Sequence, residues 1–140
     1  MANIFAPDAT NKLLHTGDHG NVVQYVYEVA KAASSGDVIF MGKIPAGIRV
    51  TGVRAKTEDT AATGTIDVGY APADGAAPVA AAAYWFDDLD TSGQATDGSS
   101  AALPIRFERD VWLQVLVNTT AFTGTPKLTF VVTGINEGVK

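Results

Sequence analysis

Two histidines are the first candidates for metal ligands in the sequence. His15 and His19 are four residues apart, which is the spacing of a zinc-binding pair on one face of a helix. Gly17 lies between them, and glycine disfavours a helix by about 1 kcal/mol relative to alanine. The sequence has no cysteine and no His-Glu-x-x-His motif that would complete a zinc site. We therefore interpret both histidines as exposed residues without a metal.

A second group of potential ligands starts at Asp88. The segment 88–93 resembles the opening of an EF-hand calcium loop, with oxygen ligands at alternate positions and a glycine at the sixth. The twelfth position, where a bidentate glutamate closes such a loop, is Ser99, and no helix is predicted on either side. We predict an acidic surface loop here, and neither a metal nor a cofactor for the protein. Whether residues 87–102 bind a cation stays open.

The motifs of nucleotide-binding proteins and hydrolases are incomplete. Gly36 and Gly42 resemble the glycines of a phosphate-binding loop, but five residues separate them instead of four. Ile44 stands where such a loop has the Ser or Thr that holds magnesium. No Gly-x-Ser-x-Gly turn is present, and the carboxylates concentrate in predicted turns. We predict that the protein is not an enzyme.

Aromatic residues offer a possible carbohydrate-binding platform. Tyr84, Trp85 and Phe86 are consecutive, and Trp112 belongs to a separate apolar segment. Aromatic residues beside apolar strand positions usually pack in a core or an interface, so burial is the preferred interpretation. Residues 118–120 fit the N-glycosylation pattern, but without a secretory signal we interpret them as a turn.

Composition limits the classes of partner. The 140 residues are 46% hydrophobic and 18% charged, which suits one folded domain. The net charge is -5 and the basic residues are scattered, whereas binding to nucleic acid phosphates requires a basic face. No apolar run approaches the ~18 residues of a membrane span, and the first residues do not resemble a signal peptide. We expect neither nucleic acid nor membrane as a partner.

Short apolar segments separated by turn residues predict an all-β domain of about seven or eight strands in a sandwich or barrel. The side chains of Val23, Tyr25, Tyr27 and Val29 should face inward. Residues 79–86 fit a helix and a strand equally well, and residues 87–102 are expected to be a long surface loop. The predicted strands are 22–29, 38–41, 48–55, 65–70, 105–108, 111–118 and 127–133.

The ends of the chain are expected to lie outside this domain. Residues 1–20 show no strand period and predict an N-terminal arm, residues 21–135 a single domain, and residues 136–140 a C-terminal tail. The arm carries two apolar pairs, Ile4 with Phe5 and Leu13 with Leu14, which we predict to anchor it on a partner. The alternative is that these side chains fold back onto the protein's own core.

Three segments in order, Ser-Gly-Asp-Val-Ile-Phe at 35–40, Lys-Ile-Pro-Ala-Gly-Ile-Arg-Val at 43–50 and Thr-Ile-Asp-Val-Gly-Tyr at 65–70, together with a closing strand at 128–132, resemble the jellyroll cement (decoration) proteins of tailed bacteriophage capsids. The resemblance spans residues 22–133. It implies a jellyroll-like antiparallel β-sandwich of about eight strands with an extended N-terminal arm, and no catalytic residues.

The same resemblance implies how such a protein assembles. The expected partners are the major capsid protein, contacted partly by adding strands to neighbouring sheets, and a second copy of the chain. The expected location is the outer surface of an HK97-type capsid in the virion, after synthesis in the bacterial cytoplasm. Many alanines in the core and free sheet edges also favour a homodimer. The alternatives are a carbohydrate-binding or tail-fibre module and, less favoured by the residues, a small β-sandwich enzyme.

Overall fold

The computed structural model describes residues 2–6, 22–58, 64–91, 95–118, 121–122 and 126–138. These residues form ten β-strands and no helix. Within the same ranges there is accordingly no helix long and apolar enough to cross a membrane. The strands are β1 (Asn3–Phe5), β2 (Val22–Val29), β3 (Val38–Ile44), β4 (Ile48–Glu58), β5 (Thr65–Pro72), β6 (Ala81–Asp90), β7 (Ala95–Ser99), β8 (Ile105–Arg106), β9 (Val111–Val117) and β10 (Lys127–Asn136).

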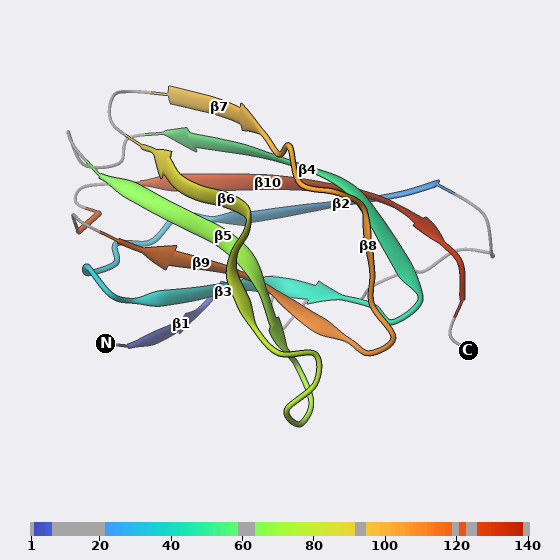
Figure 1. The fold of residues 1–140 in the computed structure, drawn as a ribbon. Coiled ribbons are helices and arrows are strands. Elements are labelled where there is room, and N and C mark those ends of the chain that lie inside the picture. Colours follow the sequence, from blue (N-terminus) through green and yellow to red (C-terminus); the bar gives the residue numbers. More distant parts are fainter. Residues whose placement is uncertain are drawn as a thin grey trace.

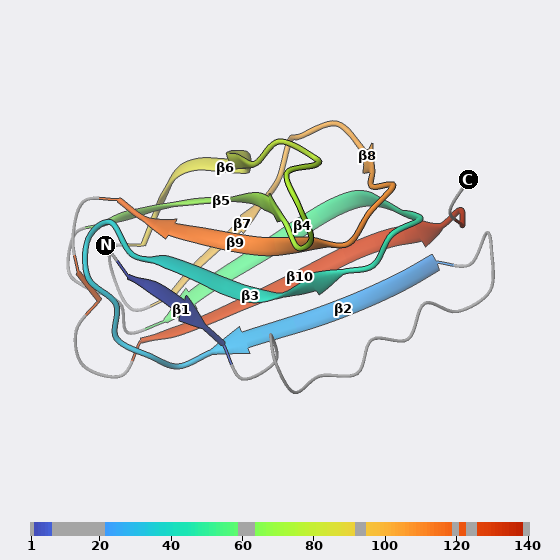
Figure 2. The ribbon, with the colours of Figure 1, turned by 90° about the horizontal axis from the view of Figure 1, so that it is seen from below.

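Two sheets pack face to face (Figures 1 and 2). Sheet A has the order β1-β3-β9-β5-β6, and sheet B has the order β2-β10-β4-β7, with β8 pairing to β4 as well. Eight of the strands form nested antiparallel pairs: β2 with β10, β3 with β9, β4 with β7, and β5 with β6. This is the jellyroll arrangement, so the predicted fold class is confirmed. The short strands β1 and β8 are additions to it.

The core lies between the two sheets and follows the two-residue period of the strands. In β2, Tyr25, Tyr27 and Val29 are buried and Val23 is partly buried, as predicted, while the residues between them are exposed. Each large side chain that is fully buried contributes about 1.5–3 kcal/mol. The largest fully buried side chains are Tyr27, Ile39, Met41, Ile44, Ile48, Ile66, Phe107, Leu113, Leu128 and Phe130.

A tyrosine in sheet B is fixed by a strand of sheet A. The hydroxyl of Tyr27 donates a hydrogen bond to the backbone oxygen of Lys43, at 2.7 Å. A Cβ atom at Gly42 would lie only 2.3 Å from the Tyr27 ring, so no other residue leaves room for it. Gly42, which looked like part of a phosphate-binding loop, is therefore a packing residue inside β3.

The Pro-Ala-Gly turn between β3 and β4 is formed as the sequence predicts. Gly47 has a φ of 84°, a backbone conformation that suits glycine. Its N–H donates to the carbonyl of Phe107, and its own carbonyl accepts the N–H of Glu137. The described part of the predicted C-terminal tail thus continues β10 and joins this turn.

The prediction of a loop over residues 87–102 is wrong. β6 continues to Asp90, and β7 pairs with β4 from Ser99 opposite Arg54 to Ala95 opposite Glu58. Both strands lie at sheet edges, where polar side chains can point to solvent, so the sequence lacks the apolar alternation of a strand. Residues 81–86 also prove to be strand, which settles the helix-or-strand ambiguity.

Candidate functional site

Residues 2–6 form an edge of sheet A, although the sequence pattern gives no sign of this strand. β1 runs parallel to β3, with Asn3 opposite Val38 and Phe5 opposite Phe40. The N–H of Val38 donates to the carbonyl of Ala2, and the N–H of Ala6 donates to the carbonyl of Phe40. Ala6 is fully buried.

One carboxylate connects β1 to the turn before β3. The two oxygens of Asp37 accept the N–H groups of Ala2 and Ser34, at 2.9 and 2.8 Å. These two hydrogen bonds, the one from Ser34 first, favour the charged form and hold the pKa of Asp37 below its ordinary value.

The predicted anchor residues lie in different environments. Ile4 pairs with Ile39 and packs against this chain's own core. Phe5 points to the outer face of sheet A and is 47% exposed. Leu13 and Leu14 lie outside the described residues, as do His15 and His19. Of the two anchor residues that the structure describes, Phe5 is the one that lies at the surface.

Phe5 belongs to an aromatic cluster on the outer face of sheet A. Its ring stacks on Phe40 with centroids 5.0 Å apart and meets the edge of Trp112 at 5.8 Å. Phe40 and Trp112 are 5.6 Å apart, and the Lys43 ammonium lies 5.1 Å from the Trp112 ring centroid. Sequence reasoning missed this cluster, because the register of three strands brings its members together.

The aromatic residues of β6 form a separate group that is mostly internal. Trp85 is 5% exposed, as the preferred interpretation predicted, and contacts the rings of Tyr70 and Phe107. The Tyr84 hydroxyl donates to the carbonyl of Leu103. Trp85 points into the core and Trp112 away from it, so the platform considered from the sequence does not form.

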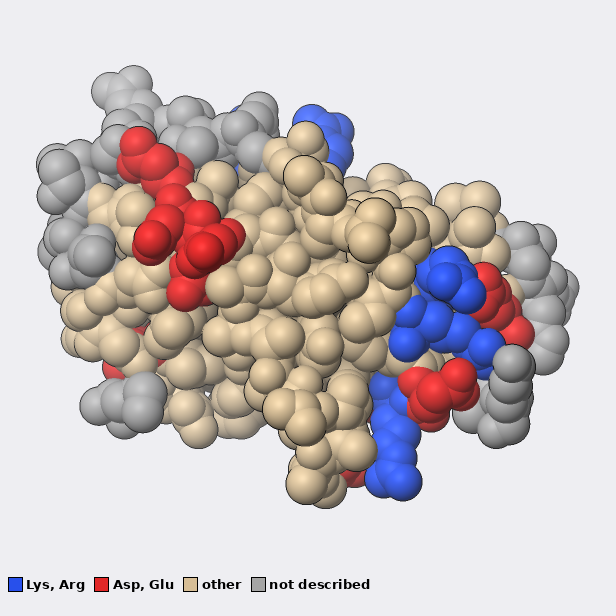
Figure 3. Space-filling model, in the orientation of Figure 1, with Lys and Arg blue, Asp and Glu red and all other residues tan. Residues whose placement is uncertain are grey.

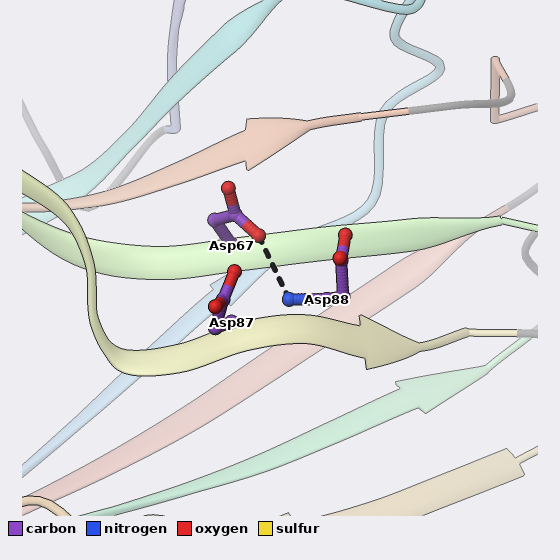
Figure 4. Close-up of side chains that lie close together, drawn as sticks. All are labelled: Asp67, Asp87 and Asp88. Carbon is purple, nitrogen blue, oxygen red and sulfur yellow. Dashed lines mark hydrogen bonds between the residues drawn. The ribbon is translucent and has the colours of Figure 1, made fainter.

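Three carboxylates gather where β5 and β6 pair irregularly (Figure 4). Oxygen atoms of Asp67, Asp87 and Asp88 all lie within 4.8 Å of one another. Adjacent residues of a strand normally face opposite sides of the sheet. Asp88, however, has a φ of 54°, and this change in backbone direction lets the carboxylates of both Asp87 and Asp88 approach Asp67. Aspartate is among the residues that best tolerate this conformation. We call these three residues the acidic cluster.

The acidic cluster is held by hydrogen bonds within the protein. Asp67 accepts the N–H of Asp88 at 2.9 Å and the side-chain amide of Asn118 at 2.7 Å. The same amide donates to Asp88 at 3.0 Å, as does the hydroxyl of Thr65. Asn118, the residue of the glycosylation pattern, thus uses its amide nitrogen inside the fold. The sequence singled out Asp88 and not Asp67, which lies far from it in the chain.

A cavity of about 230 Å³ lies at the opposite end of the sandwich, lined by residues 77–78 and 105–109. Arg106 lines it, but its guanidinium donates to the carbonyl of Gly138 and lies 3.7 Å from Glu137. Glu137 also pairs with Arg49, and this contact raises the pKa of the arginine. Arg106 and Arg49 are thus paired within the protein, whereas Arg109, which also lines the cavity, forms no salt bridge among the described residues.

The fold defines a class, the jellyroll sandwich, and comparison with solved structures shows where it recurs. No family model and no curated protein sequence matches the chain. A chain from the capsid of Ralstonia phage GP4 superposes with a TM-score of 0.76 at 15% identity, over 99% of both chains. A chain from the capsid of cyanophage Pam1 gives 0.63 at 21% identity, over 90% of this chain and 94% of that one.

A third chain comes from the acid-stable capsid of Helicobacter pylori bacteriophage KHP30. It gives a TM-score of 0.57 at 16% identity, over 83% of this chain and 93% of that one. At such low identities these likenesses establish a shared fold.

Proposed function

We propose that the protein is a non-enzymatic structural component of a phage virion. More specifically, it is a cement or decoration protein that binds and stabilises the outer surface of an HK97-type capsid, similar to the cement protein of a Bordetella bacteriophage. The observation that carries the proposal is the end-to-end likeness to a chain in the capsid of Ralstonia phage GP4, which leaves almost none of either chain unmatched.

The surface of the molecule supports an adhesive role. The outer face of sheet A exposes aromatic rings, and apolar surface of this kind commonly marks a protein interface. Among the described residues, the carboxylates that cluster are exposed or hydrogen-bonded to backbone and amide groups, without a histidine or cationic partner that would activate them. We propose the major capsid protein and a second copy of this chain as partners.

The N-terminal residues contribute to the proposed contact with the capsid. Phe5 provides an exposed ring, and Leu13 and Leu14 follow it in the chain. Ile4 acts from the inner face, where it holds β1 on the sheet.

Two measurements test the proposal. Mass spectrometry of purified virions should detect the protein in many copies, and purified protein should cosediment with capsids that lack it. Phe5→Ala should weaken cosedimentation, whereas Val22→Ala, which truncates an exposed side chain on the other sheet, should not. Absence of the protein from virions together with no binding to capsids would refute the proposal.

A carbohydrate-binding module remains the second candidate, because Phe5, Phe40 and Trp112 present adjacent rings on one face. Aromatic faces stack on sugar rings in many lectins. A glycan array separates the two functions: saturable binding that is lost in Trp112→Ala would favour this candidate over the cement protein.

A further inference from the structure

The outer faces of the two sheets differ in character. On sheet B the outward residues are largely polar or charged, as in the row formed by Glu28, Thr129 and Lys56. On sheet A the outward residues are mostly apolar. We call this surface the aromatic face; it comprises Phe5, Val38, Phe40, Trp112, Leu116 and Ala71. The polar Gln114 of β9 lies among them, opposite Phe40, and is 7% exposed.

Charges occur at opposite corners of the aromatic face. Lys43 of β3 pairs with Trp112 of β9, whereas Asp67 of β5 pairs with Leu116, four residues further along β9. Four residues of strand span about 13 Å. β3 and β5 flank β9 on opposite sides, so the line from Lys43 to the acidic cluster crosses the face diagonally. Figure 3 shows one group of acidic residues at one end of a broad uncharged surface, and Lys and Arg beside further acidic residues at the other end.

Neither corner is neutralised by an ion pair within the described part of the chain. Lys43 lies over the Trp112 ring and forms no salt bridge there. The acidic cluster receives hydrogen bonds from Asn118 and Thr65, which are uncharged. Each corner therefore offers a charge that an opposite charge on a partner could match.

We propose that a second copy of this chain covers the aromatic face through a two-fold axis. In a two-fold pair the same patch of both copies is in contact. Suppose that the two-fold axis lies in the interface and crosses the line from Lys43 to Asp67 at a right angle, midway along it. Rotation about this axis then places Lys43 of one copy opposite Asp67 of the other. Lys43 of each copy then faces the acidic cluster of the other, and Phe40 and Trp112 are buried between them. Phe5, on the edge strand β1, lies at the rim of this interface and stays open to the capsid. The inference rests on the homodimer of the proposed function and assigns its surface.

Charge reversal tests this arrangement. Lys43→Glu places a fourth carboxylate against the three of the partner's cluster, and Asp87→Lys lowers the negative charge of that cluster and places a lysine against the partner's Lys43. Asp87 is suitable because its residue is exposed and, among the described residues, its carboxylate accepts no hydrogen bond, unlike those of Asp67 and Asp88. Each variant alone should dimerise about tenfold or more weakly in analytical ultracentrifugation. An equimolar mixture of the two should recover part of the association, because the introduced glutamate then faces the introduced lysine and the native Lys43 faces an intact acidic cluster.

Matched controls separate this surface from a general effect of charge. Lys56→Glu and Glu28→Lys make the same changes on the outer face of sheet B and should leave the dimerisation constant unchanged. All four variants should keep the circular dichroism spectrum of the wild type, because the altered side chains are at the surface.

Three results would overturn the inference. The first is a wild-type protein that stays monomeric up to about 100 micromolar, which excludes a dissociation constant in the range of roughly a micromolar or below. The others are single variants that dimerise as the wild type does, and a mixture that shows no recovery. Detection of the protein in virions would leave the proposed function standing in each case. Recovery by the mixture, combined with absence of the protein from virions and no binding to capsids, would support this surface and refute the cement role.

Discussion

At the scale of single residues, Asp37 shows how one carboxylate organises the start of the fold. Its oxygens accept one backbone N–H from Ala2 and one from Ser34, so a three-residue edge strand is tied to the turn that precedes β3. An asparagine offers one acceptor oxygen and would place a donor against the other N–H.

We therefore expect Asp37→Asn to be less stable than the wild type at neutral pH. Because the pKa of Asp37 is lowered in the folded protein, the charged form stabilises the fold above its ordinary pKa of 3.8, and this contribution is lost as the pH falls through the lowered value. The difference in unfolding free energy between the two proteins should shrink below that range. Urea titrations at pH 7, 5 and 3 measure it, and a difference independent of pH would contradict the assignment.

The acidic cluster leads to a prediction about calcium. Ca²⁺ takes about 6–8 oxygen ligands, and here three carboxylates converge, two of which already accept the Asn118 amide. Millimolar calcium should leave the melting temperature unchanged in differential scanning fluorimetry, with magnesium as the comparison. A rise of several degrees that disappears in Asp87→Asn would show a cation site instead.

At the scale of elements, β1 is the segment whose role is least evident from its sequence. A strand of three residues contributes little pairing energy, and its position depends on Ile4 inside and Phe5 outside. Substitutions of these two side chains can therefore distinguish the two interpretations of the N-terminal residues, docking on a partner and packing on the protein's own core.

Ile4→Ala should lower the free energy of unfolding by about 1–2 kcal/mol, less than the about 2–5 kcal/mol typical of a fully buried isoleucine, because Ile4 is partly buried. Phe5→Ala should change stability less and weaken partner binding more. Chemical denaturation and capsid cosedimentation measure the two effects. If deletion of residues 2–20 left the melting temperature unchanged, β1 would not belong to the protein's own fold.

At the scale of the whole molecule, the nested pairing joins the first long strand to the last. β2 pairs with β10 along its whole length, so one of the inner strands of sheet B comes last in the chain among the described strands. The sandwich core cannot close without it, and contacts this distant in sequence favour slow, cooperative folding.

Phe130→Ala should therefore destabilise the whole domain, by about 3–5 kcal/mol, because the ring is fully buried between the sheets. Val131→Ala, one residue away on the outer face of sheet B, should cost about 0.5 kcal/mol or less. Fluorescence and circular dichroism should report the same transition for Phe130→Ala. Separate transitions for the two probes would show that the sheets do not unfold together.

The sequence by itself determined the class of fold. Alternating apolar residues and turn signals located the segment 22–29 and most of the other long strands. They could do so because the two-residue period of a half-buried strand is visible in the strand's own residues. The inward face of β2 followed from the same rule.

Only the tertiary structure decided the rest, because it depends on pairing between distant segments. β1 and β7 form strands because they pair with β3 and β4, and their own composition does not predict this. The acidic cluster needs the register of β5 against β6, and the aromatic face needs the register of β1, β3 and β9. A strand's own residues specify which side chains share a face, but its neighbours in the sheet determine which of them meet.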